Sequence, residues 1–289
     1  MTKFGKAFNL TKPGIAILLD LVAVATFALG LTNLSVLWKV LPLLVSGTLA
    51  SFSSSLANNF IDRDIDRKMG RTKWRSSIGS TMGYLVAIPV MLGVSLTVSL
   101  IFLNVATTLW IFAGFLSYSF LYTLILKRRT SWNIVIGGIA GSFPALAGWS
   151  AVNTPISLVS IFVAVIVFLW TPTHFWTLAL KYKDDYKSAK IPMLPAVKDE
   201  RYTINAIIIN TFILIAFSFL PLAINMGFPI LYDILLAPVS LYFILKVVTL
   251  RSRIGSSLLS SSLRAFLASN YYLSAFLGIL ILGAVLRLL

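Results

Sequence analysis

Three residues spaced four apart form the pattern in this chain that most clearly predicts chemistry. Asn58, Asp62 and Asp66 share one face if the segment is helical, because four residues at about 100° each drift only ~40° per step. Carboxylate and amide oxygens aligned in this way repel each other unless a hard cation lies between them. Oxygen ligands without Cys or a nearby His favour Mg²⁺, which completes its shell with water and substrate phosphates. The pattern therefore predicts a magnesium site for a phosphorylated ligand.

A second acidic pair, Asp184 and Asp185, follows in a similar basic setting. Two such clusters, each holding Mg²⁺, would clamp a diphosphate, stabilise it as a leaving group and so ionise an allylic carbon. We predict Asp62, Asp66, Asp184 and Asp185 as the catalytic acids. The basic side chains predicted to bind the diphosphate are Arg63, Arg67, Arg71, Arg75, Lys127, Arg128 and Lys181. The alternative is a solvated loop with local Asp and Arg pairs, which leaves the alignment of Asn58 with two acids unexplained.

Three further groups have two interpretations each. His174, the only histidine, either has a functional role within the bundle or hydrogen-bonds a neighbouring helix. Asp20 lies at a similar depth and either lines the substrate cavity or pairs with a base of a neighbouring helix. Tyr118 and Tyr122 either point phenols at the diphosphate or anchor a helix end at the membrane interface.

Long apolar segments must position these residues. The chain is 58% hydrophobic and 11% charged, whereas a soluble domain carries about 25% charged residues. A bilayer core of about 30 Å needs ~20 apolar residues per helix. Nine segments meet this need: Gly14 to Leu34, Val40 to Ala57, Tyr84 to Leu103, Val105 to Leu126, Trp132 to Ala151, Ile156 to Leu180, Ile204 to Met226, Pro229 to Val248 and Ala265 to Leu286.

Basic residues sort to one side of these spans. With a cytoplasmic N-terminus, 22 of the 24 Lys and Arg lie at cytoplasmic ends or loops, and only Lys39 and Arg287 do not. This alternation predicts nine helices with the C-terminus outside, and it explains the net charge of +15 without a nucleic-acid partner. The absence of Cys excludes disulfides and thiolate sites. We predict an all-α, multi-pass protein of the cell membrane, with one domain over residues 1–289 surrounding a central cavity that opens to the cytoplasm.

The acidic motif and several other blocks resemble the UbiA-type intramembrane prenyltransferases, and within them the branch that farnesylates protohaem IX. The blocks lie between residue 10 and about residue 195: Leu10-Thr11-Lys12-Pro13, Asp62 to Arg75, Tyr122-Thr123, Leu126 to Thr130, Asn133-Ile134-Val135-Ile136-Gly137-Gly138, Trp170-Thr171-Pro172, His174-Phe175-Trp176 and Ile191-Pro192-Met193-Leu194-Pro195. Gly14, Ser76 and Lys190 depart from the usual haem-branch residues. Lys181 replaces an acid of the second superfamily motif, so we expect it to contact phosphate or porphyrin carboxylates.

The resemblance implies transfer of farnesyl from farnesyl diphosphate to a vinyl group of haem B, with water added, to give haem O. It implies Mg²⁺ as cofactor, haem B as substrate rather than cofactor, and haem A synthase or oxidase assembly proteins as downstream partners. The functional role of His174 would then be to ligate or orient the haem iron or to handle the proton of the added water, and Trp176 joins it as a residue expected to line the haem cavity. One alternative is a UbiA-type enzyme with an aromatic or isoprenoid-lipid acceptor. Another is a transporter of an anionic substrate, which paired broken spans around a mid-membrane site would favour.

Overall fold

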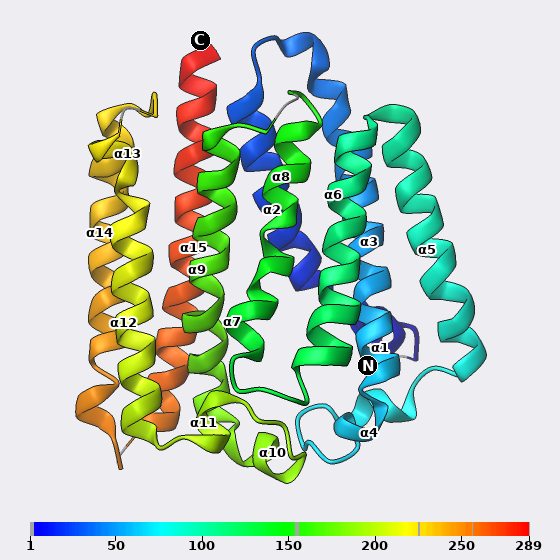
Figure 1. The fold of residues 1–289 in the computed structure, drawn as a ribbon, viewed down its shortest axis with the longest axis vertical. Coiled ribbons are helices and arrows are strands. Elements are labelled where there is room, and N and C mark those ends of the chain that lie inside the picture. The colour runs from blue at the N-terminus through cyan, green and yellow to red at the C-terminus, as the bar shows by residue number, and fades with distance from the viewer. Residues whose placement is uncertain (1–2, 154–155, 225, 256, 289) are drawn as a thin grey trace.

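The computed structural model describes residues 3–153, 156–224, 226–255 and 257–288, and its regular structure in these ranges is helical throughout. The long helices run along the long axis of the molecule, with the N-terminus near one end and the C-terminus at the other (Figure 1). The predicted all-α, multi-pass architecture is confirmed.

Eight helical segments within the described ranges are long and apolar enough to cross a membrane. They are α2 (Pro13–Gly30), η1 with α3 (Leu34–Ile61), α5 (Thr81–Phe102), α6 with η3 (Val105–Leu126), α9 (Leu158–Lys181), α12 (Glu200–Ser218), α14 with η5 (Ile230–Arg253) and α15 (Leu258–Leu288). The short helices are α1 (Lys3–Leu10), α4 (Arg63–Asp66), η2 (Lys73–Ser77), α10 (Lys183–Ser188), α11 (Leu194–Val197) and α13 (Leu220–Ala223).

The predicted span from Trp132 to Ala151 differs, because it is broken. It consists of α7 (Asn133–Gly137), η4 (Gly138–Gly141) and α8 (Phe143–Ser150), and it still runs from one end of the bundle to the other (Figure 1). Close packing accounts for its glycines: a Cβ on Gly138 would lie 3.1 Å from Thr171, and one on Gly148 would lie 2.0 Å from the Ala23 carbonyl oxygen. Nine crossings thus comprise eight long helical segments and one interrupted segment in the described chain.

The bundle has two halves that meet along α2, α8, α9 and α15. In the N-terminal half, α3 packs against α2, α5 and α6; in the C-terminal half, α9, α12, α14 and α15 pack together. The large, fully buried aromatic side chains lie mostly in the C-terminal half, including Phe162, Phe243, Tyr272 and Phe276.

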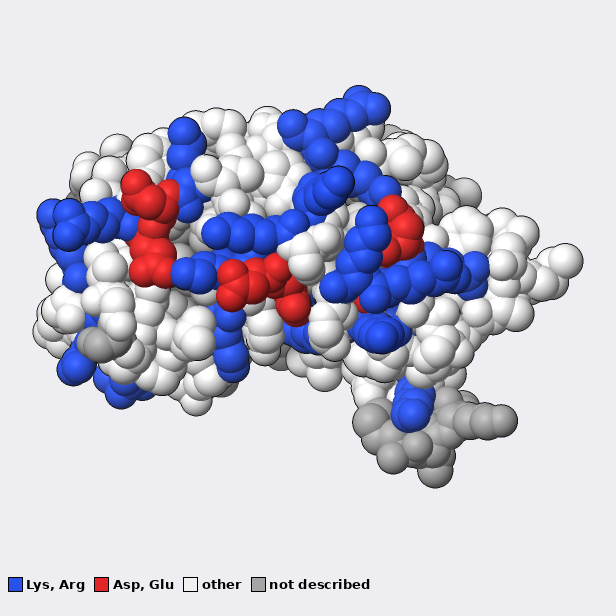
Figure 2. Space-filling view, turned by 90° about the horizontal axis from the view of Figure 1, so that it is seen from below, with Lys and Arg blue, Asp and Glu red and all other residues white. Residues whose placement is uncertain are grey.

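We call the end that carries residues 58–75 and 181–201 the acidic end. Figure 2 looks onto this end and shows the acidic side chains lying among numerous Lys and Arg side chains. At the opposite end, Lys39 donates to the Ala151 carbonyl at 3.2 Å, and Arg287 donates to the Leu29 carbonyl at 2.7 Å. These two bases, the exceptions to the predicted charge sorting, therefore cap the carbonyl ends of the crossing segments.

Candidate active site

The three residues of the first motif are brought together at the end of α3. This helix ends at Ile61, Asp62 departs from helical geometry with ψ 11°, and α4 resumes with a hydrogen bond from the Asp66 N–H to the Asp62 carbonyl at 2.8 Å. Asn58, Asp62 and Asp66 are 5%, 1% and 5% exposed. Two carboxylates and an amide are therefore withdrawn from solvent at the acidic end.

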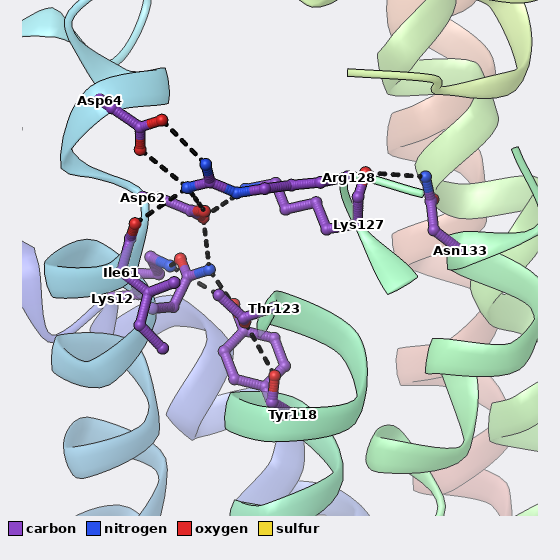
Figure 3. A network of polar contacts seen from close by, with 10 residues as sticks. Lys12, Ile61, Asp62, Asp64, Tyr118, Thr123, Lys127, Arg128 and Asn133 are labelled. Atoms are coloured by element: carbon purple, nitrogen blue, oxygen red, sulfur yellow. Dashed lines mark hydrogen bonds and ion pairs between the residues drawn. The ribbon is translucent and has the colours of Figure 1, made fainter. Parts of the chain in front are cut away.

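A network of hydrogen bonds links Asn58 and Asp62 to the start of α2 and to η3 with the residue that follows it (Figure 3). The Asn58 amide nitrogen donates to Asp62 Oδ2 at 2.7 Å and to Thr123 Oγ1 at 3.1 Å. Lys12 Nζ donates to Asn58 Oδ1 at 2.5 Å, and Lys127 Nζ pairs with Asp62 Oδ2. Asp62 Oδ1 is buried and accepts no hydrogen bond from the described residues.

A π-helix supplies these partners on the second crossing segment after α3. In η3 (Ser117–Leu126), the Lys127 N–H bonds to the Tyr122 carbonyl at 2.9 Å, and Thr123 Oγ1 bonds to the Tyr118 carbonyl at 2.8 Å. The main-chain bond spans five residues and widens the turn, and within this π-helix Tyr118 and Thr123 both contact the α3 network. The Tyr118 and Tyr122 rings stack with centroids 5.7 Å apart. Gly137 makes room for Tyr122, since a Cβ there would lie 2.5 Å from the ring.

Lys12 enters from the start of α2. Its Nζ also lies 3.4 Å from the Tyr118 hydroxyl, so the ammonium group bridges α3 and η3. The pKa of Lys12 falls to about 7: burial is the main cause, the charges of Arg75 and Lys127 contribute, and Asp62 and Asp66 oppose the shift. The surroundings therefore destabilise the charged form of Lys12, and a bound anion would stabilise it.

Lys127 and Arg75, the other bases near this network, differ in how far nearby acids neutralise their positive charge. Burial alone would lower the pKa of Lys127, but the charge and hydrogen bond of Asp62 outweigh it and raise the pKa. Burial is the main cause that lowers the pKa of Arg75, and Asp66 opposes it. Arg75 Nε is buried and has no hydrogen-bond partner among the described residues. The site thus carries more positive charge than its own acids neutralise.

The two residues of the second acidic pair have different surroundings. Asp185 accepts hydrogen bonds from the backbone N–H groups of Gly70 and Arg71 at 3.3 and 3.4 Å, which joins α10 to the loop after α4. Asp184 is exposed. Arg71 and Lys181 lie over the Tyr182 ring, 5.0 and 5.4 Å from its centroid. The two acidic clusters are therefore neighbours, connected through main-chain contacts.

Three of the predicted diphosphate ligands point elsewhere in this structure. Arg63 donates to Thr81 Oγ1 and to the Gly79 carbonyl, each at 2.9 Å. Arg128 forms a bidentate pair with exposed Asp64 at 2.7 and 2.8 Å, and its Nη2 also lies 3.8 Å from Asp62 Oδ1. Arg67 is exposed. Arg63 and Arg128 instead brace the turn between α3 and α5 and the contact between α4 and η3.

The structure does not bring His174, Trp176 and Asp20 into this network. His174 Nδ1 hydrogen-bonds Ser269 Oγ at 2.8 Å, and its ring stacks on Trp170 with centroids 4.1 Å apart. Trp176 is buried, and its indole nitrogen has no partner among the described residues. Asp20 accepts a hydrogen bond from Thr48 at 2.5 Å rather than pairing with a base. The bond from His174 to Ser269 on α15 agrees with the second interpretation of His174, a hydrogen bond to a neighbouring helix.

The donors around Asp62 fit a Mg²⁺ ion with few protein ligands. Asp62 Oδ1 is buried and accepts no hydrogen bond from the described residues; Arg128 Nη2 lies 3.8 Å from it. Asn58, one helical turn earlier on α3, offers a second hard oxygen. Within the described ranges no three His, Cys, Asp or Glu side chains are close enough to form a metal cluster. Two ammonium groups hold the oxygens instead. A cation arriving with its own phosphate ligands would need only one or two protein oxygens.

Lys12 and Thr123 are site residues that reasoning from acid spacing missed. Both occur in blocks that carry the family resemblance, Leu10-Thr11-Lys12-Pro13 and Tyr122-Thr123, and this was the available signal. Lys12 and Thr123 are 111 positions apart, so their spacing in the sequence gives no sign that they share a site.

The fold and the site define a polytopic prenyltransferase: the UbiA prenyltransferase family matches residues 19–270, and the chain belongs to this family. Protoheme IX farnesyltransferase 2 of Picrophilus torridus is 43% identical over 78% of this chain and 79% of its own length. Protoheme IX farnesyltransferase of Sulfurisphaera tokodaii is 36% identical over 73% of this chain and 72% of its own.

Solved structures confirm the fold at low sequence identity. A digeranylgeranylglyceryl phosphate synthase is 16% identical, with a TM-score of 0.76 over 99% of both chains. A UbiA homologue from Archaeoglobus fulgidus, bound to DMAPP and Mg²⁺, is also 16% identical, with a TM-score of 0.70 over 94% of this chain and 99% of its own.

Proposed function

We propose that this chain transfers the farnesyl group of farnesyl diphosphate to a vinyl group of protohaem IX, with addition of water, to form haem O and diphosphate. The observation that carries the proposal is the 43% identity to a protoheme IX farnesyltransferase over 78% of the chain. The buried network of Asn58, Asp62, Lys12 and Lys127 supports it, because it offers hard oxygens and excess positive charge for a metal diphosphate.

The residues act mainly on the leaving group. Lys127, Lys12 and Arg75 would hold the diphosphate, while Asn58 and Asp62 with Asp66 would hold Mg²⁺. Asp185 fixes the adjoining loop through the Gly70 and Arg71 N–H groups. When bound, Mg²⁺ supplies further positive charge to the leaving diphosphate. The carbon–oxygen bond breaks with its electron pair on the diphosphate. The vinyl π electrons form the new carbon–carbon bond, and a water oxygen adds to the remaining cationic carbon and releases a proton.

The proposed setting is the cell membrane with the acidic end in the cytoplasm. The charge sorting supports this orientation, because 22 of 24 bases lie on the predicted cytoplasmic side. In this setting water-soluble Mg²⁺ and diphosphate exchange at the acidic end, whereas the farnesyl chain and the macrocycle lie against the apolar bundle. Haem A synthase or oxidase assembly proteins would take up the product.

Incubating the purified protein with haem B, farnesyl diphosphate and Mg²⁺ tests the proposal, with mass spectrometry of the haem as readout. We expect a haem that gains one farnesyl group and one water. A parallel reaction replaces haem B with an aromatic quinone precursor. Prenylation of that acceptor alone would refute the haem assignment and favour the alternative UbiA-type acceptor.

A further inference from the structure

Lys12 has a backbone conformation that a lysine rarely adopts. Its φ of 54° and ψ of 60° lie in the left-handed region, directly before Pro13 and the start of α2. This conformation is unfavourable for a residue with a Cβ, so it persists only where the surrounding structure enforces it. Residues in this state are concentrated at functional sites.

Neighbouring contacts fix the position of Lys12. Asn59 donates to the Leu10 carbonyl at 2.7 Å, and the Thr11 hydroxyl donates to the Phe8 carbonyl at 2.7 Å. The Lys12 carbonyl then accepts from the Ile15 N–H at 2.9 Å. The main chain is thus held on both sides, while the side chain extends from it past Tyr118 to Asn58.

The end of this side chain lies where a metal ligand is needed. Nζ holds Asn58 Oδ1 at 2.5 Å, while the Asn58 amide nitrogen donates to Asp62. The two bonds orient the amide so that its oxygen faces the ammonium group. Lys12 and a Mg²⁺ ion compete for Asn58 Oδ1. Two positive groups that share this oxygen repel each other, so only one of them can bind it closely at a time.

We propose that Lys12 is a tethered cation that exchanges partners: it occupies Asn58 Oδ1 without metal, and it transfers to the diphosphate when Mg²⁺ takes that oxygen. The ligand class is a metal-bound diphosphate ester. The inference rests on the proposed function only for Mg²⁺ and diphosphate, and it needs neither haem nor farnesyl. The anchored main chain fixes the reach of Lys12, and the flexible four-carbon side chain allows the exchange.

The proposal predicts opposite changes in two affinities. Without Lys12, Asn58 Oδ1 loses its competing cation, so Mg²⁺ alone binds more tightly. The diphosphate loses a charged partner, so pyrophosphate with saturating Mg²⁺ binds more weakly. A residue that merely supports the fold would change both affinities in the same direction.

The experiment compares Lys12→Met with the intact protein by calorimetry, using Mg²⁺ alone and then inorganic pyrophosphate at saturating Mg²⁺. We expect Mg²⁺ to bind about threefold to tenfold more tightly, and pyrophosphate to bind about tenfold or more weakly. Lys68→Met is the matched control, because Lys68 is an exposed base of the same end. It should leave both constants unchanged.

Lys12→Gln is the second variant if Lys12→Met does not fold, since its amide can still donate to Asn58 without carrying charge. It should weaken pyrophosphate binding as Lys12→Met does. Weakening of both ligands, or no change in either, would overturn the exchange. A failure to form haem O would leave these binding results intact, so it would refute the acceptor assignment separately.

Discussion

The two halves of the bundle use polar side chains differently. In the C-terminal half, several buried hydroxyls and amides pair with each other across helices: Ser218 with Tyr272 at 2.5 Å, and Asn210 with Thr173 at 2.9 Å. Trp176 Nε1 and Ser240 Oγ are neutral buried atoms of that half without a hydrogen bond among the described residues. In the N-terminal half, the acidic end has charged groups with buried atoms that form no hydrogen bond, including Asp62 Oδ1 and Arg75 Nε. Satisfied neutral pairs stabilise helix contacts, whereas unsatisfied charged groups mark where a ligand completes the network.

Removing the charge of Asp62 should have the largest effect on activity and so test the difference between the two halves most directly. Asp62→Asn keeps the shape of the side chain but leaves buried Lys127 without its ion pair and Mg²⁺ without a carboxylate. We expect turnover to fall by about 10²- to 10³-fold. Ser218→Ala in the other half should lower stability by about 1–3 kcal/mol, because Tyr272 loses a partner, and leave turnover unchanged. Comparable turnover losses in both variants would refute the division.

Two glycines allow a smaller comparison between the halves. Gly137→Ala places a methyl group 2.5 Å from the Tyr122 ring and should push this ring out of its stack with Tyr118. We expect turnover to fall about tenfold. Gly278→Ala meets nothing within 4 Å on α15, so it should stabilise the helix by about 0.5–1 kcal/mol without a kinetic effect. Steady-state kinetics and thermal unfolding would distinguish them, and an equal effect on turnover would contradict the role of Tyr122.

His174 should behave as a member of the C-terminal half. His174→Asn can keep the bond to Ser269 but leaves a gap beside Trp170 and Phe266, so we expect a stability loss of about 1–2 kcal/mol. The absorption spectrum of bound haem should not change. A shifted haem spectrum would show instead that His174 reaches the iron and that the site extends into both halves.

The exposed pair of Asp64 and Arg128 should give the smallest effect. Arg128 holds the pKa of Asp64 below its usual range, so this carboxylate contributes stability above its unfolded pKa and loses it as pH falls through the lower folded value. Because Asp64 is largely exposed, Asp64→Asn should cost less than about 1 kcal/mol at pH 7. Unfolding curves at pH 7 and pH 3 would test this, and a larger difference at pH 3 would contradict it.

Hydropathy predicted most of the fold because length and apolarity alone define a crossing segment. The segment Val105 to Leu126 has the predicted bounds. Hydropathy does not detect how the backbone bonds within a segment, so it missed both the break between Asn133 and Ser150 and the π-helix at Ser117–Leu126. Residue spacing grouped Asn58 with Asp62, since they are local neighbours. It did not predict that Lys12 reaches them, because that contact depends on how α2 packs against α3.

The capped opposite end has a mechanical consequence. Lys39 and Arg287 tie their side chains to carbonyls of distant segments, and Asn153 does the same with the Gly30 carbonyl. Such cross-links restrain helix separation there, while at the acidic end Lys12 and Lys127 join α2 and η3 to α3 through side chains of the proposed substrate site. A bundle fixed at one end opens by pivoting about it. We therefore expect displacements during substrate entry to be smallest near Gly30 and Ala151, and to grow along each helix towards Asp62.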